Sequence, residues 1–220
     1  MCESYDKGLS IVDYIGSAKD VIIPNEIEGK TILSIGPKAF SEKELTSVSL
    51  PDSLQKIGLE AFCENFLTTV NFPLGLTHIG GDAFYKNKLK ELMIPETVMS
   101  LDAGAFCRNE IEKLTIEAPL LTIASHCFCK NLLTELRLPD TVKFIRDYSF
   151  SNNNFQHLSL PTHIEAIEDS AFAESEKLET VRMKKSFMHK VPRIFRGSPI
   201  DDIDYIDYID YIDYIDYSIW

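Results

Sequence analysis

The sequence predicts a solenoid, in which one chain winds through about eight stacked coils of short β-strands joined by helical turns. The first observation is a phenylalanine that recurs every 22 residues. It occupies Phe40, Phe62, Phe84, Phe106, Phe128, Phe150 and Phe172. The second is that other apolar positions keep the same period, so each coil repeats one set of core-facing side chains. A single coil cannot bury these side chains alone, whereas stacked copies share one continuous core.

The first extended segment of each coil begins five residues after the phenylalanine and reads L-x-x-V-x-L-P. In one copy its apolar positions are Leu89, Leu92 and Ile94. Apolar residues two positions apart suit a short strand with one buried face. Proline follows in five coils and ends the strand because it cannot donate a backbone hydrogen bond. Glu117 takes the place of this proline in one coil, and Pro119 is displaced nearby.

The second segment of each coil, L/V-x-x-I, predicts another short extended piece. It closes on an apolar residue at Ile57, Ile79, Leu101, Ile123, Ile145 and Ile167. The Ala-Phe segment that follows is expected to form a helical turn that drives the ring into the core. The seventh coil carries one extra residue, so its strand runs through Leu178, Val181 and Met183.

An asparagine recurs three residues after the phenylalanine. It stands at Asn65, Asn87, Asn109, Asn131 and Asn153. An amide at each coil can bond the backbone of the turn and of its neighbours, so we interpret this row as a structural ladder. A binding row is the alternative interpretation.

These residues resemble the BspA-like leucine-rich repeats, whose pattern is close to I-G-x-x-A-F-x-x-C/N-x-x-L-x-x-I-x-I-P-x-x-V. The copies nearest to it are residues 57–62 and 89–95, and residues 14–31 look like the family's first, capping coil. The usual cysteine is asparagine here. The resemblance implies a leucine-rich-repeat solenoid, a right-handed horseshoe or superhelix of the α/β type. It also implies roles in binding, including adhesion and host contact, and no catalytic residues.

Three regions follow from these patterns. Residues 1–34 are expected to form an N-terminal capping coil, residues 35–205 the repeats, and residues 206–220 a low-complexity tail. Residues 203–217 read Ile-Asp-Tyr five times, and residues 200–205 look like the strand of an eighth coil. The tail is interpreted as a flexible acidic end. Two alternatives are a short tyrosine motif that is modified or bound, and pairing on the exposed end of the solenoid.

Charge and hydropathy exclude several classes of protein. The formal net charge is −12, of which residues 199–220 supply seven Asp and no Lys or Arg. An acidic surface argues against general nucleic-acid binding, which needs a basic footprint. No run of 18 apolar residues exists, so no membrane insertion is expected. The sequence begins without a recognisable leader, which predicts a cytoplasmic protein; the alternative is a cell-surface or secreted adhesin whose leader is missing.

The cysteines are the main candidates for chemistry. Cys63, Cys107 and Cys129 share one phase and most simply fill a tight turn. The functional alternative is a metal or redox cluster of Cys107, Cys127, Cys129 and His126, for which the spacing is a weak zinc signal. A Cys107–Cys129 disulfide across adjacent coils is geometrically allowed, but the missing leader argues against it. We expect no cofactor, no metal and no enzymatic activity.

A protein-binding scaffold is therefore the favoured function, with a partner that the sequence does not identify. The outward positions of the first strand form a mixed polar face with a charged centre. Its candidate binding residues are Glu91, Met93, Lys113, Glu135, Arg137 and His157. In the second segment, Met99, Leu121 and Phe144 stand where other coils carry polar residues, which predicts an exposed apolar patch. The basic stretch of residues 184–196 is interpreted as a solvated turn; docking of the acidic tail on it is the alternative.

Overall fold

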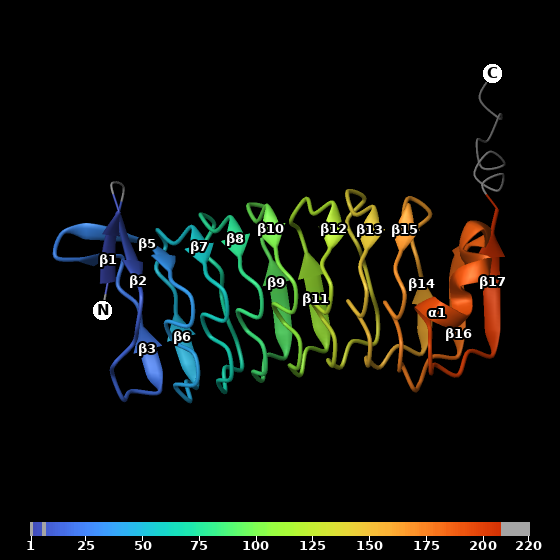
Figure 1. The fold of residues 1–220 in the computed structure, drawn as a ribbon, viewed down its shortest axis with the longest axis horizontal. Coiled ribbons are helices and arrows are strands. Elements are labelled where there is room, and N and C mark those ends of the chain that lie inside the picture. The colour runs from blue at the N-terminus through green and yellow to red at the C-terminus, as the bar shows by residue number, and fades with distance from the viewer. Residues whose placement is uncertain (1, 6–7, 208–220) are drawn as a thin grey trace, which may run out of the picture.

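The computed structural model describes residues 2–5 and 8–207, with side chains from Gly8 onward. It is a β-solenoid of about nine turns that stack along one long axis (Figure 1). A single hydrophobic core runs through the stack from Leu9 in the first coil to Phe195 in the last. The expected architecture of stacked coils is confirmed.

One long side of the solenoid, here called the first face, carries the strands that precede the proline position. They are β3 (Asp20–Ile22), β6 (Ser47–Ser49), β9 (Glu91–Ile94), β11 (Lys113–Ile116), β14 (His157–Ser159), β16 (Thr180–Lys184) and β17 (Asp202–Ile206). Neighbouring strands pair in parallel at equivalent positions, for example Leu92 with Leu114. Side chains alternate between solvent and core, as in β9, where Leu92 and Ile94 are buried.

The first face is divided into three pieces: β3–β6, β9–β11 and β14–β16–β17. Between them, residues 69–71 and 135–137 form no strand, so the expectation of a strand in every coil is wrong at these two positions. The predicted strand of the last coil is confirmed as β17. Its neighbour β16 supplies Arg182 to Asp204 at 3.3 Å, and Lys185 lies 3.0 Å from Asp207. The interpretations of the tail beyond residue 207 lie outside the described residues.

The opposite long side, here called the second face, carries the short strands that follow the proline position. They are β5 (Lys30–Ile35), β7 (Lys56–Ile57), β8 (His78–Ile79), β10 (Ser100–Leu101), β12 (Thr122–Ile123), β13 (Phe144–Ile145) and β15 (Ala166–Ile167). They also pair in parallel, and this face is divided between β10 and β12. Figure 1 shows the two rows of arrows along opposite edges of the stack.

The N-terminal end has a pairing of its own. The strand β2 (Gly8–Ile11) lies beside β5, and β1 (Cys2–Tyr5) folds back on β2 in antiparallel fashion. A second antiparallel strand, β4 (Glu26–Ile27), pairs with β5. An antiparallel strand at the end of a parallel stack covers an edge that would otherwise stay open. This suits a capping coil, although the boundary at residue 34 stays a prediction.

The Ala-Phe segment forms two successive turns rather than the expected helical turn. In one coil, the Ala61 N–H donates to the Gly58 carbonyl and the Cys63 N–H donates to the Glu60 carbonyl. Glu60 has a φ of 52°, in the left-handed region, which a right-handed helical turn does not contain. The reason is that the Phe62 N–H bonds the Ala83 carbonyl of the next coil at 2.8 Å. Among the described residues, helix occurs only at η1 (Lys185–Lys190) and α1 (Val191–Ile194).

The recurring phenylalanines form one continuous ring stack. Centroids of successive rings lie 5.1 to 6.0 Å apart along the stack, and the ring planes are tilted by at most 24°. Tyr14 occupies the ring position of the first coil and Phe195 that of the last. The sequence predicted about eight coils where the structure has about nine, because Tyr14 does not look like a member of the phenylalanine row.

The asparagine row is a buried structural ladder, as predicted. The Asn109 Oδ1 accepts from the Leu89 N–H at 3.1 Å, and its Nδ2 donates to the carbonyls of Phe84 and Phe106. Each amide thus joins the turn of its own coil to the coil before it. In the last coil, Ser198 takes this role: its Oγ accepts from the Ser175 N–H and donates to the Phe172 carbonyl.

Candidate functional site

A depression on the first face lies over β9 and β11. We call it the Met93 depression. It is lined by Thr69, Val70, Asn71, Glu91, Leu92, Met93, Lys113, Thr115 and Glu117. It borders residues 69–71, where the first-face sheet has no strand. The break in the sheet therefore coincides with the depression.

The floor and the rim of the Met93 depression differ in chemistry. Val70 and Leu92 are buried beneath it, while the Met93 side chain is 55% exposed. Glu91 and Lys113 are exposed and lie opposite each other in the parallel pairing of β9 and β11. An apolar, unbranched side chain within a charged rim can contact an apolar side chain of a partner.

Three predicted residues, Glu91, Met93 and Lys113, meet in this depression. Sequence reasoning missed Val70, because its period marks it as core, and Glu117. The signal for Glu117 was its replacement of the proline that ends the first strand in other coils. The structure does not bring the remaining predicted residues to the same place.

On the second face, Met99 and Leu121 are exposed by 75% and 58%, on neighbouring coils. Phe144, by contrast, is half-buried, and the Arg146 guanidinium lies 5.7 Å from its ring centroid. The predicted patch is therefore a pair of exposed residues with Phe144 partly covered. Neither residue lines the Met93 depression.

The coil that carries Leu121 departs from its neighbours in its backbone. The Met99 N–H donates to the Thr77 carbonyl at 2.9 Å, and the Lys143 N–H donates to the Leu121 carbonyl at 2.8 Å. Among the described residues, no equivalent bond joins the Leu121 N–H to the Met99 carbonyl. The displaced Pro119 explains the departure, because it changes the turn that precedes Leu121. Here the Leu120 N–H donates to the Ala118 carbonyl two residues earlier, whereas in the preceding coil the Val98 N–H donates to the Pro95 carbonyl three residues earlier.

The remaining candidates lie further along the first face. Glu135 and Arg137 are exposed on a stretch without a strand, and their charged atoms are 4.0 Å apart. His157 begins β14, and its Nδ1 lies 2.8 Å from the Thr180 Oγ1. His157 also lines a second depression, nearer the C-terminal end of the solenoid.

The structure joins Cys107 and Cys129 in a disulfide, the pairing that the sequence analysis argued against. Their shared phase on adjacent coils brings the two Cα atoms to 4.7 Å, within the range that a disulfide spans. Cys63 and Cys127 are free and buried, and burial raises the pKa of the Cys63 thiol to about 11. His126 is exposed and stacks on Tyr148. The described residues hold no group of three or more His, Cys, Asp or Glu side chains placed to bind a metal ion.

Comparison with known proteins supports the fold. The sequence model of the BspA type leucine rich repeat region matches in six copies, over residues 33–155 and 100–218. A leucine-rich cell surface protein from Faecalibacterium prausnitzii is 18% identical, with a TM-score of 0.55, and the match covers 93% of this chain and 76% of that one. The Treponema pallidum leucine rich repeat protein is 20% identical, with a TM-score of 0.55 and coverage of 90% and 94%.

A leucine-rich repeat protein from Bacteroides ovatus is 18% identical, with a TM-score of 0.51 and coverage of 93% and 69%. No curated protein matches the chain. In the part of the chain that the structure describes, no helix has the length and apolar character needed to cross a membrane.

Proposed function

The chain belongs to the BspA-type leucine-rich-repeat family, and we propose that it is a non-enzymatic protein-binding scaffold. The proposed binding site is the Met93 depression, where a segment of the partner protein would rest across β9 and β11. The observation that carries the proposal is the exposed Met93 side chain above the buried Val70 and Leu92. Repeat proteins present such faces as extended binding surfaces.

The layout of the depression suits a protein segment. Interfaces gain most of their affinity from a few apolar or aromatic anchors that are shielded by a polar rim. Here Met93 offers the apolar contact, and Glu91, Lys113 and Glu117 supply charges of both signs around it. A partner segment would therefore place an apolar side chain against Met93 and pair its own charges with the rim.

The proposal is tested by changing Met93 and a matched position. Met93→Lys puts a charge into the contact, while Ser159→Lys puts the same charge at the equivalent strand position of β14, outside the depression. Wild type and both variants are immobilised, and proteins retained from native extract are identified by mass spectrometry. A partner that binds wild type and Ser159→Lys but not Met93→Lys supports the site.

Two outcomes contradict this site. One is a partner that Met93→Lys retains as well as wild type does. The other is equal loss of the partner in both variants. Circular dichroism of both variants must show the wild-type fold, because an unfolded variant would lose any partner.

A second candidate function is a cell-surface or secreted binding protein. The disulfide favours it, because disulfides persist in oxidising compartments and are rare in the cytosol. The F. prausnitzii structure of the same fold carries the description of a cell surface protein. Protein from the native host, alkylated at once without reductant, would keep Cys107 and Cys129 unmodified if the chain is exported. Alkylation of both would count against export.

A further inference from the structure

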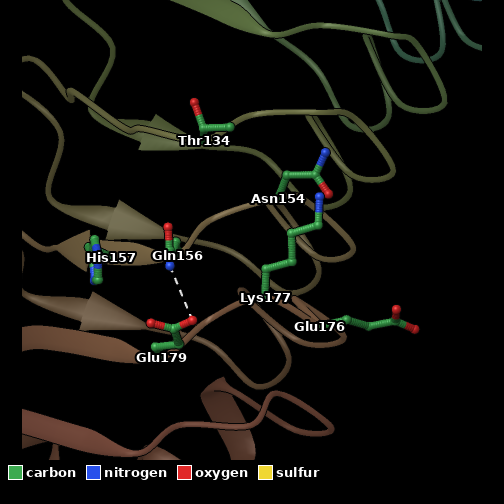
Figure 2. Close-up of a pocket in the computed structure, with 7 residues that line it drawn as sticks. All are labelled: Thr134, Asn154, Gln156, His157, Glu176, Lys177 and Glu179. Carbon is green, nitrogen blue, oxygen red and sulfur yellow. Dashed lines mark hydrogen bonds between the residues drawn. The ribbon is translucent and has the colours of Figure 1, made fainter.

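A second depression lies on the first face near the C-terminal end of the solenoid. We call it the Gln156 depression. It is lined by Thr134, Asn154, Gln156, His157, Glu176, Lys177 and Glu179 (Figure 2). These residues come from three successive coils. The feature is separate from the Met93 depression and shares no residue with it.

An inserted residue accounts for the place of the Gln156 depression. Leu133 and Phe155 follow their ring-stack phenylalanines by five residues, whereas Leu178 follows Phe172 by six. The extra residue lengthens the turn that carries Glu176 and Lys177. In addition, residues 135–137 of the coil on the other side form no strand. The depression thus lies between a lengthened turn and a break in the sheet.

The polar groups are arranged in a row across the coils. Thr134, Gln156 and Glu179 occupy equivalent positions of three successive coils, so the row spans roughly 10 Å at ordinary strand spacing. The Gln156 Nε2 donates to a Glu179 carboxylate oxygen at 3.1 Å. This bond orients the amide and leaves its Oε1 able to accept. Figure 2 shows Lys177 extending toward Asn154, while Glu176 points away from the other residues.

The residue types that line the Gln156 depression indicate which class of ligand it can bind. Every lining residue is polar, so the apolar surface of the depression comes only from the carbon stems of polar side chains, and none of its residues is an apolar side chain such as Met93. Its two carboxylates and one ammonium give only a small net charge, which does not select a strongly charged ligand. What it offers is closely spaced donors and acceptors: amides, a hydroxyl, an imidazole and carboxylates. A chain of hydroxylated rings fits this lining, because each hydroxyl can both donate and accept and the hydroxyls stand at adjacent positions.

We propose that the Gln156 depression is a carbohydrate-binding site that takes a neutral oligosaccharide. Gln156 and Glu179 form its centre, Asn154 and Lys177 one wall, and Thr134 the end of the row. Because the site is open to solvent and its lining contains no Phe, Tyr or Trp, binding is weak for a single site and is selective through hydrogen bonds.

The test is a titration of the full chain, labelled with ¹⁵N, with three neutral hexasaccharides: cellohexaose, maltohexaose and chitohexaose. At least one is expected to shift the backbone amide signals of Gln156 and Glu179 and the side-chain amide signal of Asn154. Gln156→Ala is expected to weaken that binding roughly tenfold, the size of one lost hydrogen bond to a polar ligand. Glycerol at the same hydroxyl concentration should not reproduce the pattern.

The matched control is Lys90→Ala, an exposed residue at the equivalent position three coils earlier. It should bind the oligosaccharide as wild type does. The proposal is overturned if none of the three probes shifts these signals, if the shifts fall elsewhere, or if glycerol produces them equally. It is also overturned if Gln156→Ala, shown to be folded by its own spectrum, binds with unchanged affinity.

Discussion

Cys107 and Cys129 close a covalent loop around the coil in which Leu121 has lost its backbone bond to Met99. The same coil separates Phe106 from Phe128, whose ring centroids lie 6.0 Å apart, the widest spacing in the stack. The disulfide therefore lies beside the break between β10 and β12 on the second face.

Reduction of the disulfide should weaken the whole fold. A loop of 22 residues corresponds to about 3 kcal/mol in the chain-entropy model of cross-links. Cys107→Ser with Cys129→Ser is expected to lower the free energy of unfolding in urea by about that amount and to abolish the effect of dithiothreitol. Cys63→Ser, a buried free cysteine of the same phase, is the control and should retain the response to dithiothreitol. Equal stability of wild type with and without reductant would contradict the prediction.

Removal of one ladder amide should cost more than removal of an exposed one. Asn109→Ala leaves the Leu89 N–H and the Phe84 and Phe106 carbonyls without their side-chain partner in the core. The expected loss is roughly 3 kcal/mol or more in urea unfolding, because each unsatisfied buried group costs about 1 to 3 kcal/mol. Asn71→Ala, on the exposed rim of the Met93 depression, should change stability by less than about 0.5 kcal/mol. Similar losses for the two variants would show that the row is not structural.

Gly104 and Gly29 both have positive φ angles, of 69° and 72°, but differ in their surroundings. A Cβ at Gly104 would meet the Asp82 carboxylate, whereas a Cβ at Gly29 would meet nothing within 4 Å. Gly29→Ala should cost about 1 kcal/mol for the left-handed backbone alone, and Gly104→Ala more. Asp82→Ala in the Gly104→Ala background should remove the extra loss of stability at Gly104, as measured by a double-mutant cycle. If the extra loss of stability persists without the Asp82 carboxylate, the contact with Asp82 is not its cause.

Asp82 should make the stability of the protein depend on pH. Burial, and then the neighbouring Glu60, raise the pKa of Asp82 above its ordinary value. The folded state therefore disfavours the charged carboxylate, and this penalty is present at neutral pH and disappears as pH falls through the raised pKa. Asp82→Asn is expected to raise the melting temperature at pH 7 and to lose that advantage at acidic pH. A gain that is the same at both pH values would reflect only the tolerance of Asn for left-handed backbone.

The period in the sequence was sufficient to predict the coils, the core position of the recurring phenylalanines and the asparagine ladder, because each depends on side chains that recur at equivalent positions. Tyr14 was missed because its ring serves the stack without repeating the Ala-Phe motif. The helical turn was predicted wrongly for a different reason. Glu60 and its equivalents adopt left-handed backbone because their turn bonds the next coil, and that partner is not visible within one repeat.

The Met93 depression could be predicted only in part. Glu91, Met93 and Lys113 were identified because strand alternation fixes which side chains face outward. The break of the first face at residues 69–71, which the depression borders, has no counterpart in the repeat pattern, since Val70 and Phe72 keep their apolar phase. The disulfide was not expected because a cytoplasmic compartment disfavours it, whereas the geometry of adjacent coils already allowed the two cysteines to bond.

The backbone bonds between coils do not all run in one direction. At the turns, backbone N–H groups donate to the next coil toward the C-terminal end, as from the Phe62 N–H to the Ala83 carbonyl. On the second face they donate to the preceding coil toward the N-terminal end, as from the Met99 N–H to the Thr77 carbonyl. The peptide dipoles on these two edges therefore oppose each other along the axis. Unlike a long α-helix, whose aligned peptides make its ends electrically unequal, the described coils carry peptide dipoles that offset one another on these two edges. A preference of a charged molecule for one end is then expected to come mainly from side chains, such as the aspartates of β17.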